Sequence, residues 1–383
     1  MTDPLLIESP KALDELCVAL RGCRAIALDT EFLWTRTYYP RLGLVQLADD
    51  QGRIGLVDSV KIPDLSPLGA VLADASVVKV LHDATQDLAI LARAAGVQPA
   101  TVFDTSVAAG FCRLPVGLSL HALVLELLGV ELSKGETRSN WIARPLRPQQ
   151  LKYAAEDVAY LLEARERLLA RCVDDEVRAW MMEEMASRTA SNDSLDRDPR
   201  EAWRRVKGMA SLDARKRAVL RELAAWREVS ARESDVPRGF WLTDECLVDI
   251  AHALPATVPE LLEIRGVPRS WGKKKDGRGK AVLRCIGDAM RLPEEELPRS
   301  APSATISREE LKGRVGELRA FIAGKAKPFG IDPAVIASRA NLEAAVIADL
   351  EQRPLAPPSI RSGWRAELLA RRGGPSPLRT KGR

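Results

Sequence analysis

Short apolar runs alternate with amphipathic segments over residues 1–170 of the chain. The runs "AIALDTEF" (25–32), "LGLVQLAD" (42–49) and "RIGLVD" (53–58) follow one another too closely to leave room for crossover helices. Such spacing predicts three neighbouring strands that pair antiparallel.

The following segments predict alternating strands and helices. We expect a strand at "VVKVLHD" (77–83), a helix through "ATQDLAILARAAG" that ends at Gly96, and a short strand at "TVFD" (101–104). One further helix is predicted over 118–128. Another starts near Pro148 and runs to about Cys172, because proline suits a first helical turn and apolar residues recur at helical spacing after it. Together these elements predict an α/β domain with a mixed sheet.

Strand patterns disappear after about residue 175, and two polar or proline-rich linkers, 189–200 and 291–307, divide the remainder. Residues 200–290 and 308–352 have helical patterns, and 371–383 is predicted to be a disordered basic tail. The predicted domains are therefore an α/β domain at 1–188 and helical domains at 198–290 and 306–370.

Composition narrows the class of protein. Of 383 residues, 46% are apolar and 29% charged, which is typical of a soluble globular protein. We find no signal peptide, no membrane span, and neither a P-loop nor a GxGxxG motif for a nucleotide cofactor. The six cysteines are scattered without a CxxC pair, which favours reduced thiols and a cytoplasmic location.

Charge is distributed unevenly along the chain. Residues 1–190 contain 20 Lys and Arg against 26 Asp and Glu, whereas residues 191–383 contain 37 against 27. A basic second half of net +10 behind an acidic first half of net −6 suggests polyanion binding in the second half. Solvated outer faces of Arg-rich helices explain the charge equally well.

Four acids and one tyrosine are candidates for chemistry. Asp29 and Glu31 lie two residues apart at the end of a strand, so their side chains point to the same side. Asp87 lies one turn into a helix that follows a buried strand, and Tyr153 precedes Asp157 by four residues on a helix face. A strand end and two helices can bring these groups to one point.

Clustered carboxylates repel one another unless protons or cations neutralise them. Oxygen ligands without nearby His or Cys suit Mg²⁺ or Mn²⁺, and two such ions can promote phosphodiester cleavage. A hydroxyl such as that of Tyr153 can orient the attacking water. Each signal alone is common, since an isolated Asp on a helix is usually solvated and a Tyr beside it usually packs.

The order and surroundings of these residues resemble the ribonuclease D family of DEDD-type (DnaQ-like, ribonuclease H-fold) 3′→5′ exonucleases. "LDTEFLWTRTYYPRLGLVQLA" (28–48) is similar to the first exonuclease motif of the family, and "KVLHDATQDLAIL" (79–91) is similar to the second. "SNWIARPLRPQQLKYAAEDVAYL" (139–161) resembles the third in its Y-x3-D, or DEDDy, form. The likeness covers about residues 5–175.

The resemblance implies roles for individual residues. Asp29, Glu31, Asp87 and Asp157 would be ligands of two divalent cations, Mg²⁺ or Mn²⁺, and Tyr153 would position the nucleophilic water. Glu31 would also meet the terminal 3′-hydroxyl of the RNA. Asn140 replaces the acid that is usual before the tryptophan, from which we expect a changed local hydrogen bond and no loss of activity.

Residues 200–290 resemble an HRDC domain, and 308–352 look like a second, degenerate HRDC repeat. The segment "RSWGKKKDGRGKAVLR" (269–284) is more basic than expected for that family. Its glycines would let backbone amides approach phosphate, while its cations supply charge. The alternative is a solvated loop. The candidate RNA-binding cations are Lys273, Lys274, Lys275, Arg278 and Lys280.

Other residues near the motifs have competing interpretations. A structural hydrogen bond is favoured over a substrate contact for His82. Trp141 either packs or stacks on a base, and both remain open. Asp58 and Asp104 end strands and are predicted to cap the turn or helix that follows.

The leading hypothesis is a metal-dependent 3′→5′ exoribonuclease that releases nucleoside 5′-monophosphates and trims tRNA precursors and similar structured RNAs. The basic helical half would hold the RNA body. A DNA exonuclease is one alternative, and a catalytically silent RNA-binding scaffold is the other.

Overall fold

The computed structural model describes residues 3–133, 135–190, 195–273, 275–298, 307–351, 354–355, 359–371 and 377–378. These residues form two compact units. The first unit draws on 1–33, 42–193 and 304–383, and the second on 34–41 and 194–303. The chain therefore passes from one unit to the other four times.

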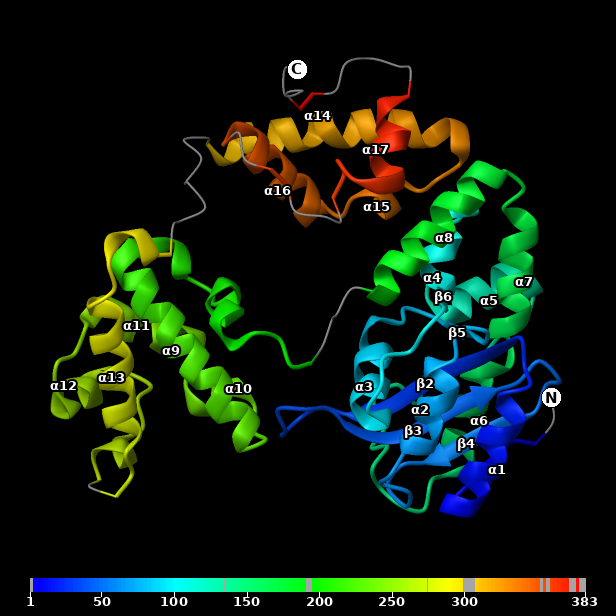
Figure 1. Ribbon diagram of the computed structural model, residues 1–383, viewed down its shortest axis with the longest axis horizontal. Helices are drawn as coiled ribbons and strands as arrows, with labels where there is room; N and C mark the ends of the chain where they lie inside the picture. Colours follow the sequence, from blue (N-terminus) through cyan, green and yellow to red (C-terminus); the bar gives the residue numbers. More distant parts are fainter. Residues whose placement is uncertain are drawn as a thin grey trace. The chain divides into compact units, whose positions relative to one another are not determined.

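A six-stranded sheet forms the centre of the first unit (Figure 1). Its strand order is β1-β4-β3-β2-β5-β6. β3 and β4 pair antiparallel, whereas β1 with β4, β2 with β5, and β5 with β6 pair parallel. The strands are β1 (Leu5–Ile7), β2 (Ala25–Leu33), β3 (Arg41–Ala48), β4 (Ile54–Asp58), β5 (Val78–Leu81) and β6 (Val102–Asp104). The predicted mixed α/β sheet is confirmed.

Helices cover both faces of this sheet. Ala25 and Ala27 of β2 lie in one buried apolar cluster, and the alternate residues Ile26 and Leu28 lie in another. α1 (Pro10–Leu20), α2 (Ser66–Ala73) and α3 (Thr85–Ala95) contribute to the second cluster. The first cluster takes residues of α4 (Thr105–Phe111), α5 (Leu120–Leu128), α6 (Pro148–Ala159), α7 (Leu161–Arg171) and α8 (Asp175–Ala190).

The helix expected from Pro148 to about Cys172 is wrong in one respect, because it is interrupted at Tyr160. This residue has φ −111° and ψ −3° and separates α6 from α7. α6 contacts β2 and β4, whereas α7 contacts β2 and β5. The interruption lets two consecutive helices follow different strands of a twisted sheet.

The C-terminal helices belong to the first unit and complete its core. α14 (Arg308–Ala326), η5 (Lys327–Phe329), α15 (Pro333–Ile336), α16 (Arg339–Leu350) and α17 (Gly363–Ala370) contribute to the same cluster as α4 and α8. The Trp364 ring is 1% exposed, and its centroid lies 5.0 Å from that of Phe111 and 6.2 Å from that of Trp180. Their relationship to an HRDC repeat stays a prediction.

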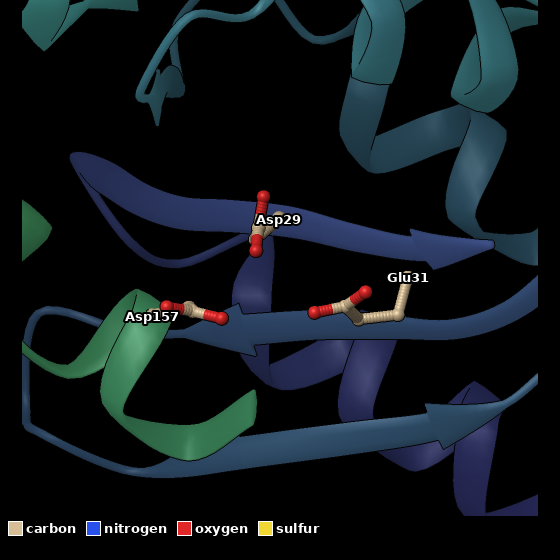
Figure 2. Close-up of side chains that lie close together, drawn as sticks. All are labelled: Asp29, Glu31 and Asp157. Carbon is tan, nitrogen blue, oxygen red and sulfur yellow. The ribbon is translucent and has the colours of Figure 1, made fainter. Parts of the chain in front are cut away.

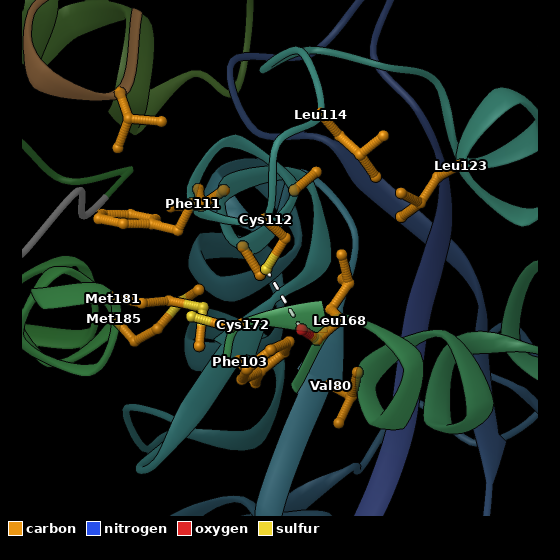
Figure 3. Packing of buried hydrophobic residues seen from close by; sticks show 14 of the residues in the cluster. Val80, Phe103, Phe111, Cys112, Leu114, Leu123, Leu168, Cys172, Met181 and Met185 are labelled. Carbon is orange, nitrogen blue, oxygen red and sulfur yellow. Dashed lines mark hydrogen bonds between the residues drawn. The ribbon is translucent and has the colours of Figure 1, made fainter. Parts of the chain in front are cut away.

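Figure 3 shows part of this cluster, where Phe103, Phe111, Met181 and Met185 pack together. The Cys112 thiol donates to the Leu168 carbonyl oxygen at 3.3 Å. All six cysteines are free. In the described part of the chain, no helix has both the length and the apolar character needed to span a membrane.

The second unit consists of short helices packed around one long helix. α9 (Ala214–Glu233) contacts α10 (Arg238–Trp241), α11 (Asp244–Ala253) and α13 (Arg278–Met290). Its other helical segments are η1 (Pro199–Arg205), η2 (Met209–Ser211), α12 (Val258–Glu263), η3 (Arg269–Gly272) and η4 (Glu294–Glu296). The predicted all-helical domain after the α/β domain is confirmed. Of the predicted basic tail, only Arg371, Pro377 and Leu378 fall within the described residues.

Candidate active site

Three carboxylates meet above the sheet face that α6 covers. Asp29 and Glu31 follow Ala25 and Ala27 at alternate positions of β2, and Asp157 comes from α6. One ligand oxygen from each of the three lies within 4.8 Å of the others. Figure 2 shows these side chains turned toward a common space. Of the predicted convergence of a strand end and two helices, the structure thus brings the strand end and one helix, α6, together in this group.

Small residues let α6 approach the sheet. Ala154, Ala155 and Val158 are buried against it, whereas Tyr153 and Asp157 are partly exposed on the same helix. The four-residue spacing places the phenol one turn before the carboxylate, as predicted.

Asp87 lies beside the three-carboxylate group and is not part of it. Its side chain is 8% exposed in the first turn of α3, and one carboxylate oxygen accepts a hydrogen bond from the Thr30 hydroxyl of β2. Thr30 lies between Asp29 and Glu31 on β2, so its side chain points to the opposite face of the sheet. There it holds the Asp87 carboxylate. Sequence reasoning missed Thr30, because its partner is 57 residues away.

Burial raises the pKa of all four acids, and repulsion from other acids of the site adds to it for Asp29, Glu31 and Asp157. The pKa of Asp29 rises well above its usual range through burial and then through the charges of Asp87, Asp157 and Glu31. Burial, followed by the charges of Asp157 and Asp87, raises the pKa of Glu31 to about 9. The pKa of Asp157 rises to about 7 and that of Asp87 to about 6, in both cases mainly through burial. Without a cation, Asp29 and Glu31 therefore favour their protonated forms at neutral pH.

The Tyr153 hydroxyl is neutral at ordinary pH. Burial and the Asp157 charge raise its pKa to about 12, and a hydrogen bond with the Thr137 side chain opposes that rise only in part. This phenol can therefore donate and accept hydrogen bonds, but it is not an anionic base.

A close backbone approach holds the segment before α6 against β3. A Cβ added at Gly43 would lie 2.3 Å from the Trp141 carbonyl oxygen, so only glycine leaves room there. Arg144 donates to both Asp58 carboxylate oxygens at 2.6 Å and to the Gly43 carbonyl oxygen at 2.7 Å. Asp58 also accepts from the Lys61 amide at 3.1 Å, so its predicted turn cap is present, whereas the ion pair was not anticipated.

The remaining residues near the motifs have structural contacts. Trp141 is 1% exposed and packs with its centroid 6.2 Å from that of Tyr153. His82 is hydrogen-bonded to the Thr105 hydroxyl and the Leu118 carbonyl oxygen, both at 2.9 Å. The structure thus shows Trp141 packed in the core and His82 in structural hydrogen bonds.

Asp104 and Asn140 both accept hydrogen bonds from nearby backbone amides, and the predicted cap at Asp104 is present. Asp104 caps α4 by accepting from the Ser106 amide at 2.9 Å. Asn140 accepts from the amides of Ile142 and Ala143 at 3.1 and 3.3 Å, which is a local hydrogen-bond arrangement within its turn.

The basic segment of the second unit is exposed at Lys273, Lys275, Arg278 and Lys280, and Lys274 lies outside the described residues. Arg278 differs from the lysines, because it pairs with Asp276 at 2.7 Å and lies over the Trp241 and Trp271 rings at 5.3 and 6.0 Å from their centroids. A Cβ added at Gly279 would lie 3.1 Å from the Trp271 carbonyl oxygen, so close packing explains the glycine at this position.

Comparisons with known proteins agree with this geometry. Residues 5–172 match the family described as 3′-5′ exonuclease, and residues 216–286 match the HRDC domain. The chain is 38% identical to Ribonuclease D of Desulfotalea psychrophila over 347 residues, which cover 90% of this chain and 91% of that protein. It is 34% identical to Ribonuclease D of Escherichia coli (strain K12) over 369 residues, covering 95% and 96% of the two chains.

Solved structures give the same result. The crystal structure of Escherichia coli RNase D, described as an exoribonuclease involved in structured RNA processing, matches with a TM-score of 0.82 and 34% identity over 96% of this chain and 97% of that one. The catalytic core of RRP6 from Trypanosoma brucei matches with a TM-score of 0.57 and 25% identity over 76% and 80%.

Proposed function

The chain belongs to the ribonuclease D family and is a 3′→5′ exoribonuclease, and we propose that its hydrolysis depends on Asp29, Glu31, Asp87 and Asp157 as ligands of two divalent cations. The observation that carries this proposal is the meeting of three carboxylates within 4.8 Å, with Asp87 anchored beside them.

The donor set fits hard divalent cations. All four groups are carboxylates. Burial is the main cause of their raised pKa values, and repulsion among Asp29, Glu31, Asp87 and Asp157 adds to it for Asp29, Glu31 and Asp157. A bound cation would relieve that repulsion. Oxygen donors of this kind suit Mg²⁺ or Mn²⁺. When bound, two such cations supply charge stabilisation at the scissile phosphate and a lowered pKa for bound water.

Tyr153 is proposed to orient the attacking water. Its neutral hydroxyl, one helical turn before Asp157, can accept from that water and donate to a phosphate oxygen. Glu31 is proposed to receive the 3′-terminal hydroxyl as well, since it is the last acid on β2.

The proposed substrates are tRNA precursors and similar structured RNAs with 3′ extensions, processed in the cytoplasm to nucleoside 5′-monophosphates. Lys273, Lys275 and Lys280 are proposed to hold the RNA body, because they are exposed cations of the segment that the chain places after η3. Replacing these three lysines with alanine should weaken binding of all RNAs alike and lower the salt dependence of binding.

The deciding experiment is digestion of 3′-extended tRNA by the purified full chain, with Mg²⁺ and with EDTA. Asp29→Asn and Asp157→Asn should each lower the rate by at least about 100-fold while leaving folding intact. Asp175→Asn is the control, because Asp175 is an exposed residue at the start of α8. Unchanged rates in the first two variants would contradict the proposed site.

End-labelled RNA and DNA of the same sequence, digested side by side, test the alternative substrate. Faster hydrolysis of DNA would replace the RNA assignment. Persistent RNA affinity without any metal binding in a titration would instead support a silent scaffold.

A further inference from the structure

The loop between β2 and β3 is bound within the second unit. Residues Trp34–Arg41 belong to that unit, although the strands on either side of them belong to the first. Tyr38 is the buried residue of this loop, with 8% of its surface exposed. Its hydroxyl donates to the Glu228 carboxylate of α9, and Arg232 Nε donates to the phenolic oxygen at 3.0 Å.

Backbone contacts fix the loop further. One carboxylate oxygen of Asp235 accepts from the amides of Tyr38 and Tyr39 at 3.1 and 3.2 Å. The Trp34 indole donates to the Tyr38 carbonyl oxygen at 3.0 Å, and the Tyr39 hydroxyl donates to Asp196. Side-chain and main-chain groups of the loop thus both have specific partners.

The Tyr38 phenol contacts one buried carboxylate and the arginines that surround it. Glu228 is 1% exposed and lies within 3.3–3.9 Å of cationic nitrogens of three arginines, Arg205, Arg232 and Arg238. Two of these, Arg232 and Arg238, also lie over the Tyr38 ring, at 5.6 and 5.7 Å from its centroid. A buried carboxylate is costly unless it is paired and hydrogen-bonded, and the phenol supplies one of those bonds. We refer to Tyr38, Glu228, Arg232 and Asp235 as the Tyr38 latch.

The chain connects this latch directly to the candidate active site. Glu31 lies three residues before Trp34 on β2, and β3 begins at Arg41. The exposed lysines proposed to hold RNA lie in the same unit as the latch. The contacts that hold the loop therefore connect the proposed RNA-binding unit to β2, the strand that carries Asp29 and Glu31.

We propose that the Tyr38 latch is a specificity-determining device, which makes RNA capture by the second unit productive at the carboxylate site. This inference rests on the proposed function of both units. With the latch closed, a structured RNA held by the second unit delivers its 3′ end at high effective concentration. With the latch open, the chain still joins the two units, but the loop no longer holds the second unit to β2, and the advantage of a structured substrate is reduced.

The experiment compares two RNAs with each variant of the full chain. One RNA is a single-stranded pentanucleotide, and the other is a stable hairpin with a single-stranded 3′ extension. Tyr38→Ala should lower kcat/KM for the hairpin RNA by about tenfold, mainly through KM, and leave the pentanucleotide within about twofold of wild type. Tyr38→Phe, which keeps the ring, should fall between wild type and Tyr38→Ala.

Glu228→Gln tests the other side of the latch, and its effect should not add to that of Tyr38→Ala, because both act on one contact. Thr35→Ala and Glu233→Gln are the matched controls, one exposed residue on the same loop and one on the same helix. Hydrogen exchange at the amides of Tyr38 and Tyr39 provides a readout independent of activity, and Glu228→Gln should accelerate it.

Two results would overturn the latch. One is an equal loss of kcat/KM on both RNAs, which would indicate damage to the carboxylate site. The other is wild-type kinetics on both RNAs in Tyr38→Ala. A wild-type protein that is inactive on both RNAs would instead refute the proposed function, so the two failures are distinguishable.

Discussion

Replacing Glu31 with glutamine should stabilise the protein when no divalent cation is present. In the folded state the pKa of Glu31 is about 9, against 4.5 for the ordinary group. At pH 7 the unfolded chain has lost a proton that the folded chain retains. Glutamine has the same shape and carries no ionisable group, so the substitution removes this penalty without creating a cavity.

The magnitude follows from proton linkage. One pKa unit corresponds to about 1.4 kcal/mol, so the interval from 4.5 to pH 7 sets an upper bound of about 3.4 kcal/mol. Glu31 is partly exposed, and its ionisation is coupled to that of Asp157 and Asp87. Both effects reduce the expected gain in the free energy of unfolding to about 1–2 kcal/mol. Because the folded pKa is raised, this group destabilises the fold progressively as pH rises from 4.5 toward 9.

Urea unfolding in EDTA at pH 4.5 and pH 8 measures the effect. The two proteins should have similar free energies of unfolding at pH 4.5, and Glu31→Gln should be the more stable at pH 8. Added Mg²⁺ should then stabilise wild type more than the variant, because the variant has lost a proposed ligand. Glu131→Gln, at an exposed position in the same unit, is the control. Equal or lower stability of Glu31→Gln at pH 8 in EDTA would refute the reasoning.

Three further predictions concern the framework of the site. Gly43→Ala should lower the free energy of unfolding by about 1–3 kcal/mol or more in urea titration, because its Cβ would meet the Trp141 carbonyl oxygen at 2.3 Å. Arg144→Met should lower the free energy of unfolding by about 3–5 kcal/mol at pH 7, because it leaves Asp58 buried without its cation. Burial alone would raise the pKa of Asp58, but the hydrogen bonds and charge of Arg144 lower it. The stabilisation that this ion pair gives the wild type should therefore be lost as pH falls below about 4. Trp364→Ala should cost about 3–5 kcal/mol and lower the melting temperature of the catalytic unit, which scanning calorimetry measures.

The sequence pattern was enough to predict those parts of the fold and site that depend only on a few neighbouring residues. The alternation in β2 places Asp29 and Glu31 on one face, and the four-residue spacing in α6 places Tyr153 beside Asp157. The end of α3 at Gly96 follows likewise, because its left-handed conformation, φ 72°, suits glycine. These features depend on backbone geometry that is the same in every protein.

Features that depend on distant partners could not be predicted in this way. The bond from Thr30 to Asp87 requires β2 and α3 to be packed already, and the Arg144–Asp58 pair joins residues 86 positions apart. Likewise, no local pattern shows that Trp364 packs against Phe111. Side-chain packing across the core selects these pairs, and their residue types are common elsewhere in the chain.

The discontinuous first unit has a consequence for folding during synthesis. Its core includes both Phe111 of α4 and Trp364 of α17, with residues 194–303 of the second unit between them in the chain. During translation, the apolar surfaces of α4 and α8 therefore stay exposed until α17 has left the ribosome. A chain interrupted after residue 298 would carry all four candidate acids on an unfinished core, prone to proteolysis and aggregation. Loss of the last helices is therefore expected to act through protein abundance in the cell as much as through the rate of the enzyme.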